Sequence, residues 1–175
     1  MARRVNATAA SLLGFLHDGP QSGYDLVQTA EASIGDFWSL TRSQVYRELA
    51  AMADAGLVEA QEAGARDRRA YALTDAGRGA FRAWLSEPPA QEQIRYPLLL
   101  VLAFARHLPP GQLAGFVAAH RAEHVGRLAG YRRQRDEALA AGARPVDLVT
   151  LNFGLRYEEA VVDWFDHLPP EVTDG

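Results

Sequence analysis

The sequence contains no cysteine, no lysine and no long apolar run. Without cysteine the chain has no disulfides, thiolate metal sites or cysteine nucleophiles, which fits a reducing compartment. The longest apolar run of note, residues 97–105, has nine residues, whereas a helix needs about 20 to cross a bilayer. We therefore expect a cytoplasmic protein without a membrane partner.

The basic residues, 18 in number, are all arginine and face 22 acidic residues, so the net charge is −4. Residues 1–87 and residues 88–175 each carry a net charge of −2. Arginine keeps its charge and binds phosphate or carboxylate through a planar fork. This composition excludes a histone-like polycation, but it allows a nucleic-acid binder whose arginines cluster on one face.

The first half of the chain predicts three short helices. Apolar residues at positions 9, 12, 13 and 16 have the spacing of one helix face. Ser22 can cap a second helix that runs to about Ile34, and Thr41 or Ser39 can cap a third that runs to about Ala55.

A hairpin and a further helix are expected next. The strand candidates are Leu57–Glu62 and Arg68–Leu73, joined by a turn at residues 64–67, and Thr74 can cap the helix that follows. This order is typical of a winged helix-turn-helix, in which the third helix enters the major groove and the hairpin reaches the flanking backbone.

The second half predicts only helices, over Ile94–His107, Pro110 to about Ala141, and Val146–Leu168, before a frayed tail at Glu171–Gly175. The last helix is apolar on more than one side, so it needs more than one packing partner, and a second copy of the chain is the expected one. We expect a mainly α protein with a winged helix-turn-helix domain over residues 1–87 and an all-helical C-terminal dimerisation domain, with possible ligand sensing, over residues 88–175.

Polar side chains gather at the start of the third helix. Glutamine can pair bidentately with adenine and arginine with guanine, and serine can donate to a phosphate. The plain alternative is a solvated polar helix face. The predicted DNA-binding residues here are Arg42, Ser43, Gln44, Tyr46 and Arg47.

Three further arginines lie near the turn of the hairpin: Arg66, Arg68 and Arg69. On the tip of a wing they would meet phosphates or a minor groove. The plain alternative is a solvated turn.

Residues 120–124 spell H-x-x-E-H, in which His120 and His124 could bind zinc and Glu123 could activate water. Both histidines lie in the apolar stripe of a predicted dimerisation helix, so a buried histidine pair is the preferred interpretation, with no metal, no cofactor and no enzyme activity. A pH-sensing or metal-sensing role for the pair stays open. A metal-dependent hydrolase stays open as an alternative.

Several motifs of the first 87 residues follow the pattern of one family. They are Leu13-Gly14-Phe15-Leu16, Gly19-Pro20, Gly23-Tyr24-Asp25-Leu26, Val45-Tyr46 before Leu49, Gly56-Leu57-Val58, and the run from Tyr71 to Arg78. With them the chain resembles the PadR-like transcriptional regulators. Residues 90–168 resemble, by helix pattern, the C-terminal domain of the longer members, which is related to the virulence-activator alpha C-terminal region.

The resemblance implies a homodimeric DNA-binding regulator, most often a repressor, that responds to a small aromatic or amphipathic effector. A two-fold dimer implies a palindromic operator. Two departures leave the operator sequence undefined: many members carry Gly-Thr-Leu-Tyr-Pro where this chain has Ser43-Gln44-Val45-Tyr46-Arg47, and a lysine and an aromatic residue where it has Arg69-Ala70. A protein–protein adaptor that uses the winged fold without DNA stays open as a second alternative.

An effector pocket between the two halves, or across the dimer, would use aromatic side chains with an arginine for a carboxylate. The candidates are Arg95, Tyr96, Arg156 and Trp164.

Overall fold

The computed structural model describes residues 5–35, 37–61, 69–92 and 94–173. The chain divides into two compact units, Met1–Gln91 and Glu92–Gly175, here called the N-terminal unit and the C-terminal unit. Within the described residues, no helix combines the length and the hydropathy needed to cross a membrane.

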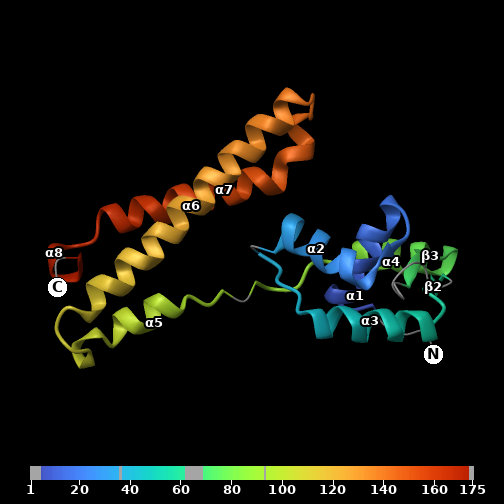
Figure 1. The fold of residues 1–175 in the computed structure, drawn as a ribbon, viewed down its shortest axis with the longest axis horizontal. Coiled ribbons are helices and arrows are strands. Elements are labelled where there is room, and N and C mark those ends of the chain that lie inside the picture. The colour runs from blue at the N-terminus through green and yellow to red at the C-terminus, as the bar shows by residue number, and fades with distance from the viewer. Residues whose placement is uncertain (1–4, 36, 62–68, 93, 174–175) are drawn as a thin grey trace. The chain divides into compact units, whose positions relative to one another are not determined.

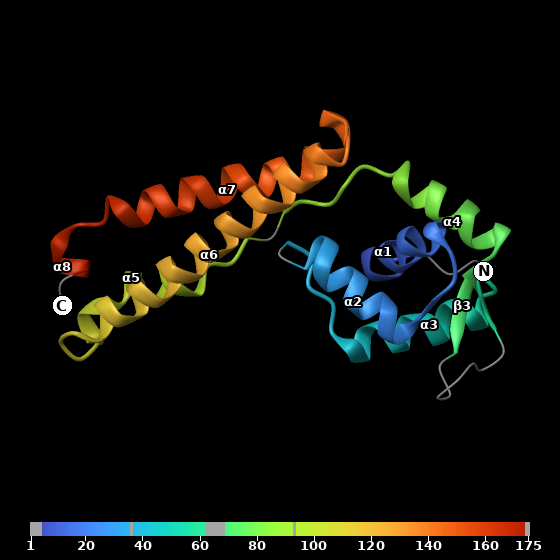
Figure 2. The same cartoon turned by 45° about the horizontal axis from the view of Figure 1, so that its top comes forward.

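The N-terminal unit contains four α-helices and three short strands among its described residues. In chain order these are α1 (Ala7–Phe15), a 3₁₀ turn (Leu16–Asp18), β1 (Gln21–Ser22), α2 (Gly23–Ile34), α3 (Arg42–Asp54), β2 (Val58–Ala60), β3 (Ala70–Leu73) and α4 (Asp75–Leu85). Helix α1 packs against α2, α3 and α4 (Figure 2). The buried side chains of α1 are joined by Leu26, Val45, Leu49 and Met52 to form the core.

Side-chain caps fix where these helices begin. Ser22 and Thr41 are the N-caps of α2 and α3, and both form capping boxes with the third residue of the helix. Thr74 caps α4 by accepting from the backbone N–H of Gly77 at 3.0 Å. The three caps predicted from the sequence therefore stand where the patterns indicated.

Strand β1 is a difference from the sequence-based expectation of a two-stranded hairpin. The sheet order is β1-β3-β2, all antiparallel, with Gln21 opposite Tyr71 and Val58 opposite Leu73. Two residues, of which the second is itself the cap of α2, are too few to show an alternation pattern, so β1 had no signal in the sequence.

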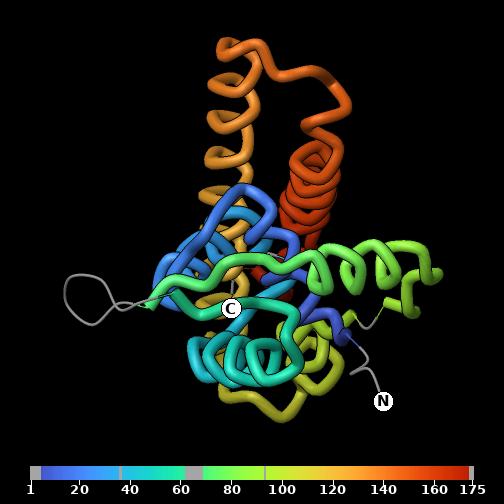
Figure 3. The backbone as a smooth tube through the Cα atoms, turned by 90° about the vertical axis from the view of Figure 1, so that its right-hand side faces the viewer, coloured from blue at the N-terminus to red at the C-terminus, as the bar shows by residue number. Residues whose placement is uncertain are grey.

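The regular elements of the C-terminal unit, among its described residues, are all helices. It contains α5 (Pro97–Ala103), a 3₁₀ turn (Ala105–His107), α6 (Gln112–Ala140), a second 3₁₀ turn (Pro145–Leu148), α7 (Val149–Asp166) and α8 (Pro170–Thr173). Helices α6 and α7 lie side by side and antiparallel (Figures 1 and 3). Leu98, Val117 and Phe165 form a small core between α5, α6 and α7.

Two helix boundaries in this unit correct the expectations. The predicted helix over Ile94–His107 begins only at Pro97, because a residue before proline avoids the α conformation. Tyr96 is accordingly extended, with φ −116° and ψ 98°. At the other end, residues 171–173 of the tail expected to be frayed lie in α8, and Val172 packs against the small core, whereas residues 174 and 175 lie outside the described residues.

Candidate functional site

Helix α3 starts at a capping box that involves one of the predicted DNA-binding residues. The Thr41 side chain accepts from the backbone N–H of Gln44 at 3.2 Å, while Gln44 Oε1 accepts from the backbone N–H of Thr41 at 2.8 Å. Gln44 is half-buried and Ser43 contacts the Thr41 hydroxyl at 3.1 Å. In the free chain, the Gln44 side chain is therefore used to begin the helix.

The two sides of α3 differ sharply in burial. Val45, Leu49 and Met52 are fully buried against the core of the N-terminal unit. Arg42 and Arg47 lie on the exposed side together with the other predicted positions, Ser43 and Tyr46. The first two turns of α3 thus present two guanidinium groups to solvent, which is the chemistry that reads phosphates and guanine.

Tyr46 is held by a close approach of α2. A Cβ placed on Gly23 would lie 2.6 Å from Cε1 of the Tyr46 ring, so a side chain at this position would displace the ring from where it lies. The ring is 46% exposed, so one face contacts Gly23 and the rest faces solvent. Gly23 therefore sets how α2 and α3 meet.

Of the predicted wing arginines, the structure describes Arg69, which is exposed just before β3. Arg66 and Arg68 lie outside the described residues.

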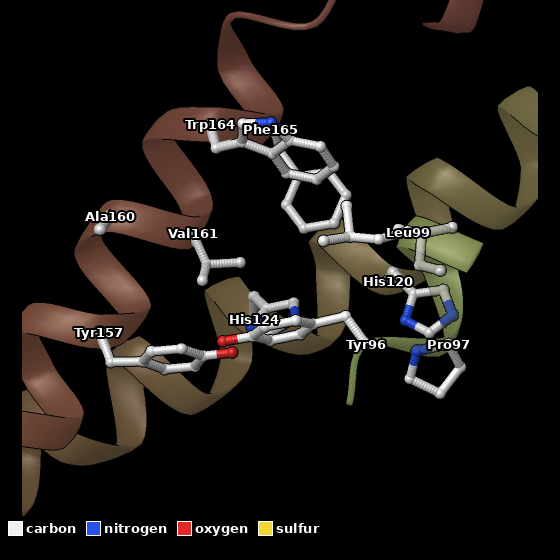
Figure 4. Close-up of a pocket in the computed structure, with 11 residues that line it drawn as sticks. Tyr96, Pro97, Leu99, His120, His124, Tyr157, Ala160, Val161, Trp164 and Phe165 are labelled. Atoms are coloured by element: carbon white, nitrogen blue, oxygen red, sulfur yellow. The ribbon is translucent and has the colours of Figure 1, made fainter. Parts of the chain in front are cut away.

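A second candidate site is a cavity of about 360 Å³ inside the C-terminal unit (Figure 4). It is lined by residues at the start of α5 and on the facing sides of α6 and α7. The lining residues are Tyr96, Pro97, Leu98, Leu99, His120, His124, Tyr157, Ala160, Val161, Trp164 and Phe165.

A charged network lies behind this cavity. Glu158 is buried, with a side chain 4% exposed, and its two oxygens lie 2.6 Å from His124 Nδ1 and 2.9 Å from Arg127 Nε. Arg127 Nη2 also lies 2.8 Å from Nδ1. One nitrogen cannot donate to a carboxylate and accept from a guanidinium at once, and the shorter contact is with Glu158. We therefore assign a proton to Nδ1, donated to Glu158, which leaves Nε2 as the ring nitrogen for other partners.

The hydroxyl groups of Tyr96 and Tyr157 meet in the cavity (Figure 4). The two rings are stacked, with centroids 6.5 Å apart. Burial, followed by the hydrogen bond to Tyr96, raises the pKa of Tyr157 far above its usual range. Tyr157 therefore keeps its proton near neutral pH.

The predicted effector residues divide into two groups. Tyr96 and Trp164 line the cavity, whereas Arg95 and Arg156 are not among the lining residues. Arg156 is exposed and pairs with Glu159 at 3.2 Å. Sequence analysis missed Tyr157 and Phe165 as site residues, although the 3- and 4-residue spacing of 157, 160, 161, 164 and 165 marks one side of α7.

The H-x-x-E-H motif is divided by the fold. His120 and His124 face the cavity, while Glu123 is exposed. Among the described residues, no group of three or more His, Asp or Glu side chains could hold a metal ion.

Comparison with known proteins places both units in described families. Residues 12–83 match the transcriptional regulator PadR-like family, and residues 94–169 match the family described as virulence activator alpha C-term. The chain is 31% identical to the probable transcriptional regulator Rv1176c of Mycobacterium tuberculosis, over 94% of this chain and 96% of that protein. It is 25% identical to the negative transcriptional regulator PadR of Bacillus subtilis, over 90% of this chain and 93% of that protein.

Solved structures have the same fold. Bacillus subtilis PadR in complex with operator DNA is similar with a TM-score of 0.77 at 22% identity, covering 92% of this chain and 96% of that one. The same protein in complex with p-coumaric acid has a TM-score of 0.70 at 23% identity, covering 92% of this chain and 95% of that one. The Vibrio cholerae virulence activator AphA has a TM-score of 0.71 at 26% identity, covering 96% of both chains. The expected fold class, a winged helix-turn-helix followed by a helical domain, is confirmed, and these regulators leave no support for the hydrolase alternative.

Proposed function

The chain belongs to the PadR-like family of transcriptional regulators, and from this we propose that it acts as a homodimeric repressor that binds a palindromic operator and responds to a small aromatic or amphipathic effector. The observation that carries the proposal is the outward side of α3, where Arg42 and Arg47 are exposed while Val45 and Leu49 anchor the opposite side.

The proposed contacts follow from the chemistry of this side. Arg47 reads a guanine edge in the major groove, and Arg42 and Ser43 hold phosphates next to it. Gln44 reaches a base once it leaves the cap. Tyr46 and the wing arginines Arg66, Arg68 and Arg69 complete the proposed contacts. The operator-bound structure of Bacillus subtilis PadR, which shares the fold, supports this placement of the function.

Operator binding is tested first by titrating the full chain with duplex DNA from upstream of its own gene. The chain is acidic overall, with a net charge of −4, so binding must come from local arginine clusters. If about eight phosphates are neutralised per dimer, the affinity falls by about 10³–10⁵ between 50 and 200 mM salt. An affinity that does not change with salt, or no binding to the upstream duplex over an unrelated one, contradicts the proposal.

The proposed dimer rests on large apolar side chains of the C-terminal unit that are exposed in the single chain. Val149 and Phe153 lie one turn apart on α7 and are 62% and 69% exposed. Leu100 and Phe104 on and after α5 are also exposed, at 64% and 55%. Exposed apolar rows of this kind mark protein interfaces, and an isologous contact with a second copy would bury them.

Phe153→Glu is expected to dissociate the dimer, because a carboxylate would lie in the apolar contact. Sedimentation velocity should show a dimer for the unchanged chain and a monomer for the variant, with an unchanged circular dichroism spectrum. The control is Arg82→Glu, a charge reversal at an exposed residue of α4 in the other unit. A variant that stays dimeric would place the dimer contact elsewhere.

The effector response follows from differential binding. A ligand that binds the DNA-free state better than the DNA-bound state lowers operator affinity by the ratio of the two affinities. The p-coumaric acid complex of Bacillus subtilis PadR supports a small aromatic effector.

A further inference from the structure

We propose that His120 and His124 bind a divalent late transition-metal ion, such as Cu²⁺ or Zn²⁺, in the cavity between α5, α6 and α7. The inference rests on the position of the pair on α6 and on a buried carboxylate behind His124 that the sequence did not reveal. It goes beyond the proposed function, and the experiments that test it contain no DNA, so it stands or fails independently of operator binding.

The two imidazoles lie on one side of α6. They are four residues apart, a spacing that places two Cβ atoms of a helix about 5–6 Å from each other. Both side chains line the same cavity (Figure 4). Two histidines at this spacing on one helix face are the pair that binds zinc in sites built on helices. The backbone of α6 therefore already sets the spacing of two nitrogen ligands.

The buried carboxylate of Glu158 fixes which nitrogen of His124 is available. Glu158 Oε2 lies 2.6 Å from His124 Nδ1, and its other oxygen accepts from Arg127 Nε at 2.9 Å. With the proton on Nδ1, the lone pair is on Nε2, which makes no hydrogen bond to any described residue. In metal sites a carboxylate in this position orients the histidine ring and raises its basicity. His124 is therefore arranged as a metal ligand.

His120 is the second nitrogen ligand. Its side chain is half-buried, and among the described residues it has no hydrogen-bond or ion-pair partner. Apart from the two histidines, the lining residues are aliphatic or aromatic, so none of them competes for this imidazole with a charged group. A bound metal ion would give His120 and His124 a common partner.

The donor set selects the class of metal ion. The lining residues include no aspartate or glutamate, and the chain has no cysteine. Tyr157 bonds to Tyr96 and keeps its proton, so it offers no phenolate. Imidazole nitrogen suits Cu²⁺, Ni²⁺ and Zn²⁺, with Cu²⁺ bound most tightly, whereas Mg²⁺ needs oxygen ligands. Water fills the remaining positions, because the site has only two protein ligands and its Tyr96 side is 41% exposed.

Trp164 lines the same cavity and provides the readout. The chain has three tryptophans, and Trp38→Phe with Trp84→Phe leaves Trp164 as the only one. In this background, purified without a histidine tag, Cu²⁺ should quench the Trp164 fluorescence to saturation and Zn²⁺ should compete with it. Mg²⁺ at millimolar concentration should do neither. Quenching that does not saturate, or that Zn²⁺ does not reverse, overturns the inference.

Matched histidine variants test the location. His120→Gln removes one nitrogen ligand and breaks no hydrogen bond or ion pair between described residues, so it should weaken Cu²⁺ binding at least about tenfold. The control is His167→Gln at the C-terminal end of α7, where the histidine is exposed beside Asp163 and does not line the cavity. An equal effect of the two variants means adventitious binding to exposed side chains and overturns the inference.

Electron paramagnetic resonance of the Cu²⁺ complex counts the nitrogen ligands. The unchanged chain should show two coordinated nitrogens, and His120→Gln should show one. A spectrum with a single nitrogen ligand, or with none, in the unchanged chain overturns the inference.

Glu158→Gln tests the carboxylate behind His124. Glutamine keeps the size of the side chain and removes its charge, so Cu²⁺ binding should weaken about 10- to 100-fold. An unchanged Cu²⁺ affinity overturns the inference, since it rests on this carboxylate. Circular dichroism shows whether Glu158→Gln stays folded, and if it does not, His120→Gln, which leaves the Glu158 contacts in place, decides the question.

Discussion

Arg47→Ala lowers operator affinity by about 5- to 150-fold and leaves the fold and the dimer unchanged. The expected loss corresponds to about 1–3 kcal/mol for a bidentate contact with a base edge. Because the Arg47 side chain is exposed on α3, truncating it leaves no cavity in the core and removes no packing contact of the core. The measurement is a titration with the upstream duplex at fixed salt, together with thermal unfolding of the same preparations.

The control for Arg47→Ala is Arg82→Ala, which removes the same charge from an exposed position in α4 of the same unit. A loss of affinity that is equal in both variants would mean that only net charge matters. An unchanged affinity for Arg47→Ala would remove the assignment of α3 as the reading helix.

Gly77→Ala destabilises the N-terminal unit by about 1–3 kcal/mol, the range for overpacking a close contact. A Cβ at Gly77 would lie 2.1 Å from the carbonyl oxygen of Leu57 and 2.8 Å from Leu73 Cδ1. That carbonyl also accepts from the backbone N–H and the hydroxyl of Thr74, at 3.2 and 3.0 Å. The added methyl group therefore pushes the start of α4 away from Leu57 and weakens the hydrogen bonds that Thr74, the cap of α4, donates to the Leu57 carbonyl.

The matched control is Gly79→Ala, two residues further along α4. A Cβ there meets no atom within 4 Å, so alanine should stabilise the helix by about 0.5–1 kcal/mol. Thermal unfolding checks both, since each kcal/mol shifts the Tm of a unit of this size by about 4–8 °C. If both variants shift the Tm in the same direction, the close contact at Gly77 does not control the packing of α4.

Much of the fold could be predicted from local signals in the sequence. The caps Ser22, Thr41 and Thr74 are visible in the sequence because a cap needs a particular side chain at a particular position. Position 97 could have been found in the same way, since proline dictates the conformation of the residue before it. Strand β1 could not, because its two residues are paired only through the distant Tyr71 and Ala70.

The cavity was only partly predictable. Tyr96 and Trp164 were expected from their aromatic character, and His120 and His124 from a motif that suggested a different chemistry. The partners of His124 come from α7, at Glu158, and from one turn along α6, at Arg127. A contact between residues 34 positions apart depends on how α6 and α7 pack, and no spacing in a single sequence encodes that register.

The cap at Thr41 has an energetic consequence for recognition. Gln44 accepts two hydrogen bonds from Thr41 in the free chain, so turning its amide toward a base forfeits them, at a cost of about 0.5–2 kcal/mol. Arg47 gives up no comparable capping hydrogen bonds when it contacts a base. A change of the base pair that Arg47 contacts should therefore lower the affinity strongly, and a change of the base pair that Gln44 contacts should lower it weakly. Natural operators can vary at the base pair that Gln44 contacts.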